Sequence, residues 1–248
     1  MTKDADWWTG FFPEFRPVFS QIPAKQSNTL ARFVVRKLDL KPGRSFLDCP
    51  CGIGRISLPL ARMGIRVTGV DITPLFLQEL ETKARRRGLK IEAVEADMRR
   101  IAFDRRFDAA GSLWTSFGYF ENEADNRLTL KRMFQALRPG GKFLLHLINR
   151  DWVMANFSDN GWFEVGGIKV LEKRSFDYAA SISRDTWYFV RNGREVAREM
   201  MLRIYSLHEL LAMFRAIGFV DLEWYGSIKE EPVSRNSRMM YIIGTRPD

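Results

Sequence analysis

Residues 48–54 read Asp-Cys-Pro-Cys-Gly-Ile-Gly, and they stand between a short apolar run, residues 45–48, and an amphipathic stretch, residues 56–63. The first pattern is typical of a buried strand and the second of a helix. Gly52 and Gly54 allow the backbone to turn tightly and to approach a ligand without a Cβ atom in the way. The start of the helix would add free N–H groups. We therefore expect a ligand-binding turn at this point.

Two more acidic residues follow the next two expected strands. Asp71 lies at the end of the strand 66–72, and Asp97 follows the strand 90–96. Because the carboxyl ends of parallel strands share one edge of a sheet, Asp48, Asp71 and Asp97 are expected to face one crevice, where the second acid can accept two hydrogen bonds from a ribose diol. Each acid alone could equally be a helix cap or part of a solvated loop, but the three together favour a nucleoside site.

The rest of the chain continues the alternation of strands and helices. Further strands are expected at residues 107–113 and 142–148, with a helix at 121–137 between them. Three longer strands follow, and then a helix and two strands; their expected ranges are 168–174, 181–190, 195–205, 206–217, 219–225 and 239–245. This pattern predicts a Rossmann-like α/β fold, with a doubly wound, mostly parallel seven-stranded sheet, a C-terminal antiparallel hairpin and an inserted antiparallel β flap.

No Pro/Gly/Ser-rich linker divides the chain, so we expect one domain over residues 1–248, with the antiparallel insert at residues 160–205. An aromatic segment, residues 1–29, precedes the first strand. Its large rings belong to Trp7, Trp8, Phe11, Phe12, Phe15 and Phe19. These rings could close over a pocket as a lid or pack against the flank of the sheet, and the sequence supports both interpretations equally.

Composition narrows the class of protein. The 248 residues include 39 Lys+Arg and 30 Asp+Glu, a net charge of +9, but the basic residues are scattered, which favours a solvated surface over a nucleic-acid groove. No apolar stretch approaches the roughly 18 residues of a membrane span, so we expect a cytoplasmic protein that does not associate with membranes. Cys49 and Cys51 are too close for an ordinary disulfide and lack partners for a zinc site, so no metal is expected.

Five stretches resemble the successive motifs of class I S-adenosylmethionine-dependent methyltransferases over residues 45–149. They read FLDCPCGIGR, GVDI, EADM, FDAAGSLWTSFGYF and LRPGGKFLL. The terminal strands, with YGS before them and RMMYIIGTRP within them, are similar to those of small-molecule members of this family that carry an antiparallel insert. Pro50 departs from the glycine that is usual in the family. Ser57 stands where a dinucleotide fingerprint has its third glycine, which argues against a nicotinamide enzyme.

The resemblance implies that S-adenosylmethionine binds at the C-terminal edge of the parallel sheet. Gly52 and Gly54 would border the methionine end of this cofactor. Asp71 would bind the ribose, and Asp97 and Met98 would contact the adenine.

Three more positions carry over from the resemblance. Ser112 and Leu113 would line the floor beneath the sulfonium, and Asp48 would orient the glycine loop or, through water, the amino group of the cofactor. The complete set of cofactor-binding residues that the resemblance implies is Asp48, Cys51, Gly52, Gly54, Asp71, Ile72, Asp97, Met98, Ser112 and Leu113.

Methyl transfer from a sulfonium is an in-line displacement, so the main contribution of the protein is to hold the reactants collinear, which can be worth about 7–11 kcal/mol. A base is needed only when the acceptor must lose a proton. The catalytic candidates beside the crevice are Tyr119, in the SFGYF loop, and His146, in the strand 142–148. Packing of Tyr119 in the core and a structural role for His146 are the alternatives.

One motif that is missing from the sequence bears on the class of the methyl acceptor. The Asn-Pro-Pro-aromatic tetrapeptide of many amino-methylating nucleic-acid enzymes is missing after the fourth strand, where the chain reads SLWTSFGYF. Together with the insert and the aromatic segment, this favours a small-molecule acceptor. An RNA or protein methyltransferase is one alternative, which only the positive charge supports. A non-catalytic cofactor-binding protein that keeps the fold is the other. Neither the methylated atom nor the oligomeric state is indicated.

Overall fold

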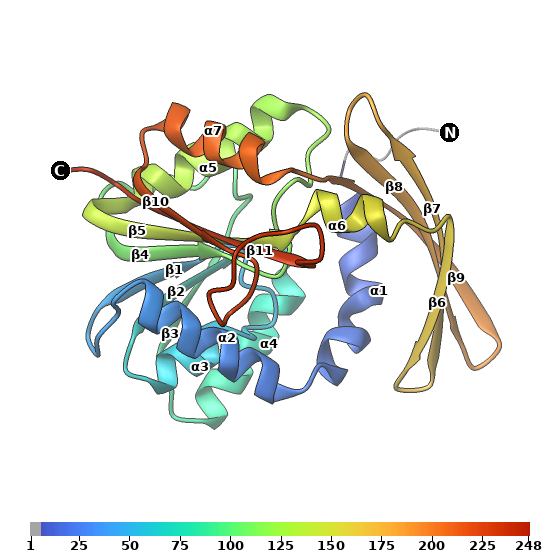
Figure 1. Ribbon diagram of the computed structural model, residues 1–248. Helices are drawn as coiled ribbons and strands as arrows, with labels where there is room; N and C mark the ends of the chain where they lie inside the picture. Colours follow the sequence, from blue (N-terminus) through green and yellow to red (C-terminus); the bar gives the residue numbers. More distant parts are fainter. Residues whose placement is uncertain (1–5) are drawn as a thin grey trace.

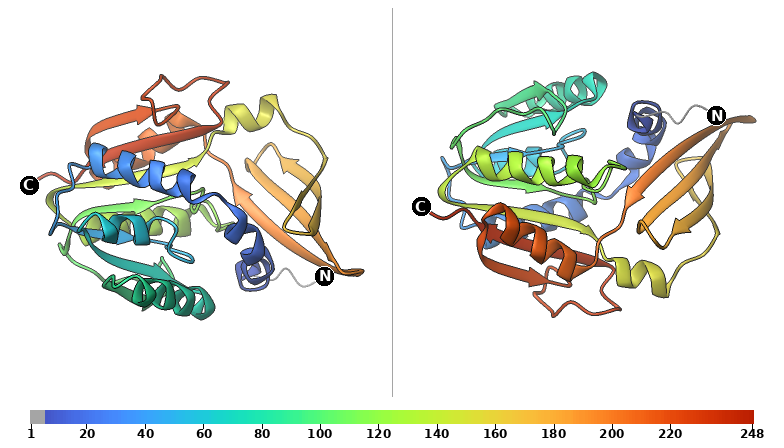
Figure 2. Two further views of the ribbon diagram at one scale, coloured as in Figure 1. Left: turned by 90° about the horizontal axis from the view of Figure 1, so that it is seen from below. Right: turned by 90° about the horizontal axis from the view of Figure 1, so that it is seen from above.

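The protein has two parts, which Figure 1 shows side by side. The structure is a computed structural model that describes residues 6–248. One part is a seven-stranded sheet with helices on both faces, and the other is a four-stranded antiparallel sheet. Helix α1 (Trp7–Gln21) lies between the two parts, as both views of Figure 2 also show.

The seven-stranded sheet has the strand order β10-β11-β5-β4-β1-β2-β3. Strands β1 to β5 are parallel, whereas β11 is antiparallel to β5 and to β10. The bounds are β1 (Ser45–Asp48), β2 (Arg66–Asp71), β3 (Ile91–Glu95), β4 (Phe107–Ser112), β5 (Leu137–Ile148), β10 (Val220–Tyr225) and β11 (Met239–Thr245). The predicted doubly wound, mostly parallel sheet with a C-terminal hairpin is confirmed.

Helices cover both faces of this sheet. Three helices lie on one face, namely α2 (Ala24–Lys37), α3 (Ser57–Arg62) and α4 (Pro74–Arg86), and two lie on the other, namely α5 (Glu123–Ala136) and α7 (Leu207–Ile217). Phe33 and Leu60 are buried against the first face, and Leu130 and Phe214 against the second. Because both faces are covered, a central strand can be buried along its whole length, as β1 is.

Four antiparallel strands form the second part, which we call the flap. They are β6 (Asn160–Val165), β7 (Ile168–Asp177), β8 (Ile182–Arg191) and β9 (Arg194–Arg203), paired in this order. Asn192 and Gly193 connect β8 to β9 with φ angles of 51° and 74°. Two positive φ angles are what a two-residue type I′ hairpin turn requires, and Asn-Gly is its preferred sequence. The inserted antiparallel flap is confirmed.

The flap leaves and rejoins the first part at neighbouring points. It is reached through α6 (Arg150–Ala155), and the N–H of Arg150 donates to the carbonyl of Tyr205 at 3.2 Å. The N–H of Arg203 donates to the carbonyl of Gly118 at 2.7 Å. A Cβ atom on Gly118, whose φ is +93°, would lie 2.2 Å from the carbonyl oxygen of Arg203, so only glycine permits this approach. The end of β9 is therefore attached by its backbone to the loop that follows β4.

Several elements differ from the sequence-based expectation. Helices α1, α2 and α6 and strand β6 lie where no element is predicted. The expected lid segment, residues 1–29, comprises α1 and the first turns of α2, while its residues 1–5 lie outside the described residues. The expected helix 121–137 ends one residue earlier because Leu137 pairs with Phe107 as the first residue of β5.

Cys49 and Cys51 are buried and free. In residues 6–248, no three His, Cys, Asp or Glu side chains are grouped as a metal ion would require. None of the helices in the same range is both long enough and apolar enough to cross a membrane.

Candidate functional site

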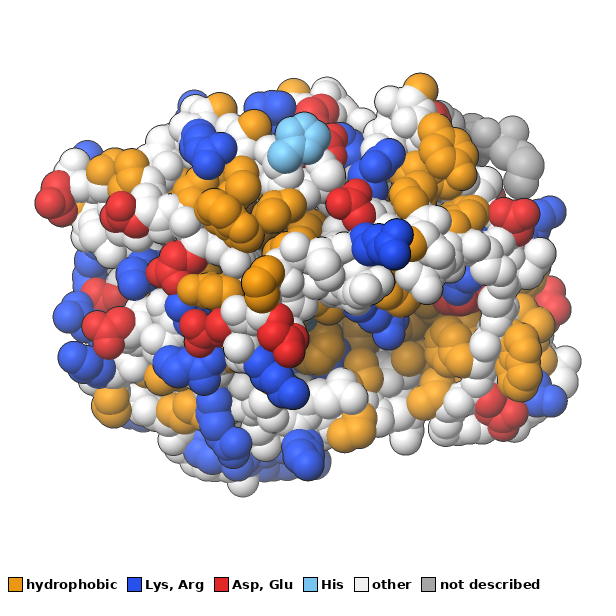
Figure 3. All heavy atoms as spheres, viewed as in Figure 1, with side chains coloured by type: hydrophobic (Ala, Val, Ile, Leu, Met, Phe, Trp, Pro, Cys, Tyr) orange, Lys and Arg blue, Asp and Glu red, His pale blue; other side chains and the backbone are white. Residues whose placement is uncertain are grey.

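A pocket of about 270 Å³ lies at the carboxyl ends of the parallel strands, between the two parts of the molecule. Figure 3 shows a hollow between these parts, with hydrophobic side chains inside it. One wall, which we call the strand-end wall, consists of the pocket-lining residues between positions 48 and 120. The other, which we call the lid wall, consists of Trp7, Trp8, Phe11, Phe12, Phe15, Phe19, Trp187, Met200 and Leu202.

The two glycines of the turn have different surroundings. A Cβ atom on Gly52, which has a φ of +52°, would meet nothing within 4 Å, and Gly52 lines the pocket. A Cβ atom on Gly54, whose φ is +81°, would lie 2.2 Å from Cδ1 of Leu80, and Gly54 is not one of the lining residues. Gly52 therefore leaves room for a ligand, whereas Gly54 leaves room for helix α4.

Asp48 ends β1 beneath the turn. Its carboxylate accepts a hydrogen bond from the hydroxyl of Ser57 at 2.5 Å, and both residues are buried. Burial raises the pKa of Asp48 to about 7, although the hydrogen bond from Ser57 opposes this shift. Asp48 lines the pocket as expected, while Ser57, at the first position of α3, supplies a partner that the sequence analysis did not identify.

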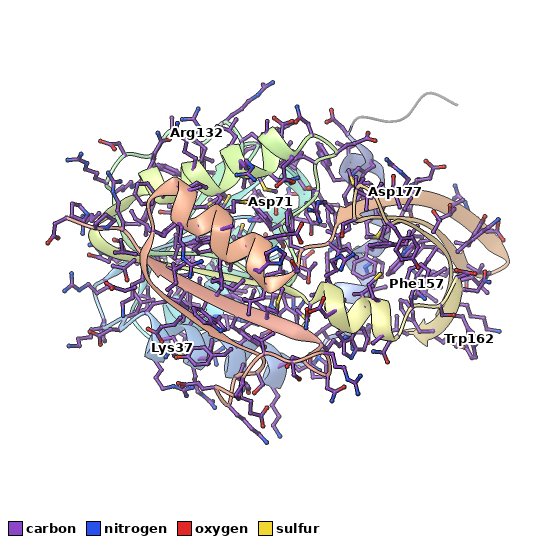
Figure 4. All side chains as sticks on the ribbon, turned by 45° about the horizontal axis from the view of Figure 1, so that its top comes forward. Lys37, Asp71, Arg132, Phe157, Trp162 and Asp177 are labelled. Atoms are coloured by element: carbon purple, nitrogen blue, oxygen red, sulfur yellow. The ribbon has the colours of Figure 1, made fainter. Side chains whose placement is uncertain are left out.

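Asp71 holds the glycine turn from the neighbouring strand. One carboxylate oxygen accepts the N–H of Gly52 at 2.8 Å, and the other accepts the N–H of Thr73 at 2.9 Å. Burial raises the pKa of Asp71 even though these hydrogen bonds favour the charged form. Asp71 and Ile72 both line the pocket. Figure 4 labels Asp71 in the seven-stranded part and Trp162 on β6 in the flap.

Asp97 and Met98 also line the pocket, after β3. Both carboxylate oxygens of Asp97 already accept hydrogen bonds from Arg99, the shortest at 2.6 Å from a guanidinium nitrogen. Burial acts to raise the pKa of Asp97, but the hydrogen bonds and charge of Arg99 outweigh it and lower the pKa. Asp97 therefore faces the pocket as an ionised carboxylate held in place by Arg99, which in turn contacts Asp125.

The loop after β4 forms the floor of the pocket. Leu113 lines it, but Ser112 does not: the Ser112 side chain is buried, and its hydroxyl donates to the carbonyl of Ser116 at 3.2 Å. Trp114 and Thr115 follow with φ angles of 62° and 60°, a left-handed conformation that costs a non-glycine residue about 1–3 kcal/mol. Such strain persists only where neighbouring structure enforces it.

His146 on β5 enforces the strained conformation of this loop. Its Nδ1 accepts the N–H of Trp114 at 3.2 Å, and its carbonyl accepts the N–H of Thr115 at 2.9 Å. The ring is stacked on Tyr241 at 4.5 Å, and it is not part of the pocket lining. Burial, with a smaller contribution from the charge of Arg55, lowers the pKa of His146 to about 3, so the ring is neutral. The structure thus places His146 behind the floor of the pocket.

Tyr119, the other catalytic candidate, does line the pocket. Its ring contacts those of Trp7 and Phe12, with centroids 5.3 Å and 5.7 Å away. Its carbonyl accepts a hydrogen bond from Nε1 of Trp7 at 3.2 Å. Burial raises the pKa of the phenol, which therefore stays protonated. Tyr119 joins the strand-end wall to the lid wall.

The six rings of the aromatic N-terminal segment all line the pocket. They also pack against the flap: the Phe11 and Phe15 rings each lie 5.3 Å from that of Trp187. The rings thus both line the pocket and pack against the flap, and the role of the segment as a lid stays a prediction. The flap residues Trp187, Met200 and Leu202 were missed, because nothing in a strand of the insert signals which side chains face a distant pocket.

Arg55 was also missed, although it directly follows the Gly-Ile-Gly turn. It lines the pocket, and its guanidinium lies over the ring of Trp114, 3.8 Å from the centroid. An arginine next to a glycine turn, in a position that starts a helix, is a signal that sequence analysis could have used.

Residues 46–141 match the model of a family described as a methyltransferase domain. The cypemycin N-terminal methyltransferase of a Streptomyces species is 28% identical over 219 residues, which cover 81% of this chain and 82% of that relative. The glycine/sarcosine N-methyltransferase of Halorhodospira halochloris is 27% identical over 206 residues, covering 79% and 73%. An S-adenosylmethionine-dependent methyltransferase from Clostridium acetobutylicum shares the fold, with a TM-score of 0.81 at 17% identity and coverage of 97% and 99%. The chain is an S-adenosylmethionine-dependent methyltransferase, with its methyltransferase domain over residues 46–141.

The cofactor of the methyltransferase is S-adenosylmethionine, as expected from the sequence. The strand-end wall fits this nucleoside in two observed respects. The Cβ position of Gly52 is open, so a ligand can approach the backbone of the turn. The carboxylates of Asp71 and Asp97 lie at the ends of adjacent strands and both line the pocket, where they can accept hydrogen bonds from a ribose and a base.

Proposed function

We propose that this methyltransferase transfers a methyl group to a small-molecule acceptor that is enclosed between the strand-end wall and the lid wall. When bound, S-adenosylmethionine supplies a methyl group on a sulfonium, which is already activated for displacement. The observation that carries the proposal is that one pocket combines nucleoside-type acids on one wall with a closed aromatic surface on the other.

In this proposal Gly52, Cys51 and Asp48 border the methionine end of the cofactor, and Asp71 and Ile72 hold the ribose. These residues all line the pocket around one turn.

Asp97 and Met98 would face the adenine, and Leu113 would lie beneath the reacting atoms; all three are lining residues. Gly54 and Ser112 support the site from behind, since the first packs on Leu80 and the second bonds to Ser116.

A small acceptor is supported by the lid wall. Six rings of α1 and three side chains of the flap cover the pocket with apolar surface, and such a cover excludes water and limits the size of what it encloses. The relatives named above are, by their names, methyltransferases that act on glycine or sarcosine and on the N-terminus of cypemycin. We extend to this chain only the small acceptor that the second of these names, glycine/sarcosine N-methyltransferase, gives.

The protein would act mainly by positioning. Holding the acceptor in line with the methyl group can supply about 7–11 kcal/mol, and an acceptor without a proton to lose needs no base. Tyr119, as a protonated phenol, would donate a hydrogen bond to the acceptor and orient it. His146 would act on the reaction only by holding Trp114 and Thr115 in the floor of the pocket.

The proposal is tested with methyl-labelled S-adenosylmethionine. Purified protein is incubated with a cell extract separated into small-molecule, RNA and protein fractions, beside an Asp71→Ala control. At a cofactor concentration below the dissociation constant of the control, we expect label in the small-molecule fraction with the wild type and much less with the control. Label in RNA or protein would instead identify one of the two macromolecular alternatives. Tight cofactor binding without label in any fraction would identify a non-catalytic protein. The proposal keeps the cytoplasmic location expected from the sequence, which cell fractionation tests.

A further inference from the structure

Several buried nitrogen atoms at the pocket have no hydrogen-bond partner. Within residues 6–248 four of them belong to pocket-lining residues, namely Nη2 of Arg55 and Nε1 of Trp8, Trp114 and Trp187, and the fifth, Nε2 of His146, lies behind the floor. No buried side-chain oxygen in the same range is left without a partner. Buried donors are normally paired, and a donor left unpaired destabilises the fold. The imbalance points to a ligand that supplies acceptor atoms.

Arg55 is the charged member of this set. It is the only cationic side chain among the pocket-lining residues in the described part of the chain, 6–248. The three lining carboxylates have other partners: Asp48 bonds to Ser57, Asp71 to backbone N–H groups, and Asp97 to Arg99.

The guanidinium has no counter-charge of its own. Burial alone lowers the pKa of Arg55 to about 10, with no carboxylate acting in the opposite direction. Arg99 shows the contrast, since it forms ion pairs with both Asp97 and Asp125. A buried charge without a partner is costly, and a protein keeps one where a ligand completes the pair.

The geometry around Arg55 suits a planar oxyanion. One face of the guanidinium lies on the indole of Trp114, a stacking arrangement that leaves the N–H groups at the edge of the plane free. Trp114 itself is fixed by its hydrogen bond to His146. An edge of parallel N–H donors matches the two oxygens of a carboxylate.

We propose that Arg55 binds a carboxylate in the part of the pocket next to the floor loop. This inference rests on the proposed function, because the carboxylate has two sources: the methionine end of the cofactor or the acceptor. In both cases Arg55 recognises the same chemical group, and its replacement removes the preference for an anionic ligand.

The first experiment addresses the cofactor. Calorimetry measures the binding of S-adenosylhomocysteine and of 5′-methylthioadenosine, which lacks the amino-acid group, to the wild type and to Arg55→Gln. If the cofactor is the source, Arg55→Gln weakens binding of the first ligand by about tenfold or more and leaves the second unchanged. Arg55→Lys keeps a charge and restores part of this preference. Arg62→Gln, at the exposed end of α3, which begins two residues after Arg55, is the control and changes neither dissociation constant.

The second experiment addresses the acceptor. Phenylacetate and its neutral amide are titrated into the same proteins, with and without saturating S-adenosylhomocysteine. If the acceptor is the source, the wild type prefers the acid to the amide by about tenfold, and Arg55→Gln loses the preference.

Two ratios of dissociation constants decide the proposal: that of the two nucleosides, and that of phenylacetate and its amide. The proposal is overturned if Arg55→Gln changes neither ratio, whatever its effect on thermal stability, because the stack on Trp114 would then be packing alone. Failure of the proposed function is read from the labelling experiment instead, as label in the RNA or protein fraction or in no fraction. In each of those cases the titrations of the wild type and Arg55→Gln still decide the role of Arg55.

Discussion

The two walls of the pocket are built by different forces. In the strand-end wall, directional hydrogen bonds fix the polar groups, as when Asp71 accepts the N–H groups of Gly52 and Thr73. In the lid wall, rings contact rings. Among the pocket-lining side chains that the structure describes, a single hydrogen bond joins the two walls, from Trp7 to the carbonyl of Tyr119. Hydrogen bonds demand one geometry, whereas apolar contacts tolerate substitution of similar volume. We infer that the first wall is specialised for one ligand and the second is adaptable.

The largest effect is expected at the turn itself. Gly54→Ala places a Cβ atom 2.2 Å from Leu80 at a φ of +81°, so strain and overlap together should destabilise the fold by about 2–6 kcal/mol. Thermal denaturation measures the loss. Gly88→Ala is the control, since its φ is also positive, +64°, but nothing lies within 4 Å of the new atom. Equal losses in the two variants would mean that the strand-end wall is less tightly fixed than we infer.

The next effect concerns the buried acid under the turn. Folded Asp48 keeps its proton up to a pKa of about 7, while the unfolded chain releases it near 3.8. The folded state therefore binds more protons between these values, and stability is lost as pH rises from about 4 to 7. Asp48→Asn removes this pH-dependent loss of stability. We expect the loss to be about 2 kcal/mol in the free energy of unfolding, which is less than the full pKa shift would give because the structure relaxes around the charge.

Melting temperatures of the cofactor-free proteins at pH 5 and pH 8 test this prediction. The melting temperature of the variant should rise relative to that of the wild type at the higher pH. The low pKa of His146 makes stability increase with pH, but this trend is common to both proteins and cancels in the difference. An identical difference at both pH values would show that Asp48 is ionised throughout.

A change in affinity without a change in fold is expected at the second strand. Asp71→Ala removes the acceptor for the Gly52 and Thr73 N–H groups and the carboxylate that faces the pocket, so binding of S-adenosylhomocysteine should weaken about tenfold or more. Calorimetry measures the dissociation constant, and circular dichroism checks that the fold is kept. Unchanged affinity would remove the ribose assignment.

The smallest effect is expected in the lid wall. Trp7→Phe keeps a ring but removes the hydrogen bond to the carbonyl of Tyr119, worth about 0.5–1.5 kcal/mol, so the KM for the acceptor should rise a few-fold. The dissociation constant of S-adenosylhomocysteine should stay the same. If it changed as much as the KM, the two walls would not be independent.

The parallel core was predictable because its signals are local. Each strand is a short apolar run, and the acids Asp48, Asp71 and Asp97 follow three of them. Helix α1 was not predicted: Pro13 and Pro17 lie within it, and proline normally disrupts a helix interior. Strand β6 was missed because half of its side chains are exposed, so that its apolar signal is weak.

The site could be predicted by position but not by orientation. Sequence places Gly52 and Gly54 in one turn, but only packing shows that the second faces Leu80. In the same way, Ser112 ends β4 and Leu113 begins the loop, and only the structure shows that Leu113 lines the pocket while Ser112 bonds to Ser116. Arg55 and the flap residues depend on contacts between distant segments, which a single sequence does not contain.

The neighbouring attachment points of the flap, where Arg150 bonds to Tyr205, have an evolutionary consequence. Because the chain departs and returns at almost one place, the whole segment can be exchanged for a homologous one without cutting a strand of the parallel core. A chimera joined at these two residues would inherit the parallel core and α1 from one parent, and the flap side chains of the lid wall, Trp187, Met200 and Leu202, from the other. Diversification of such enzymes would then proceed by grafting a cassette, with the nucleoside half left untouched.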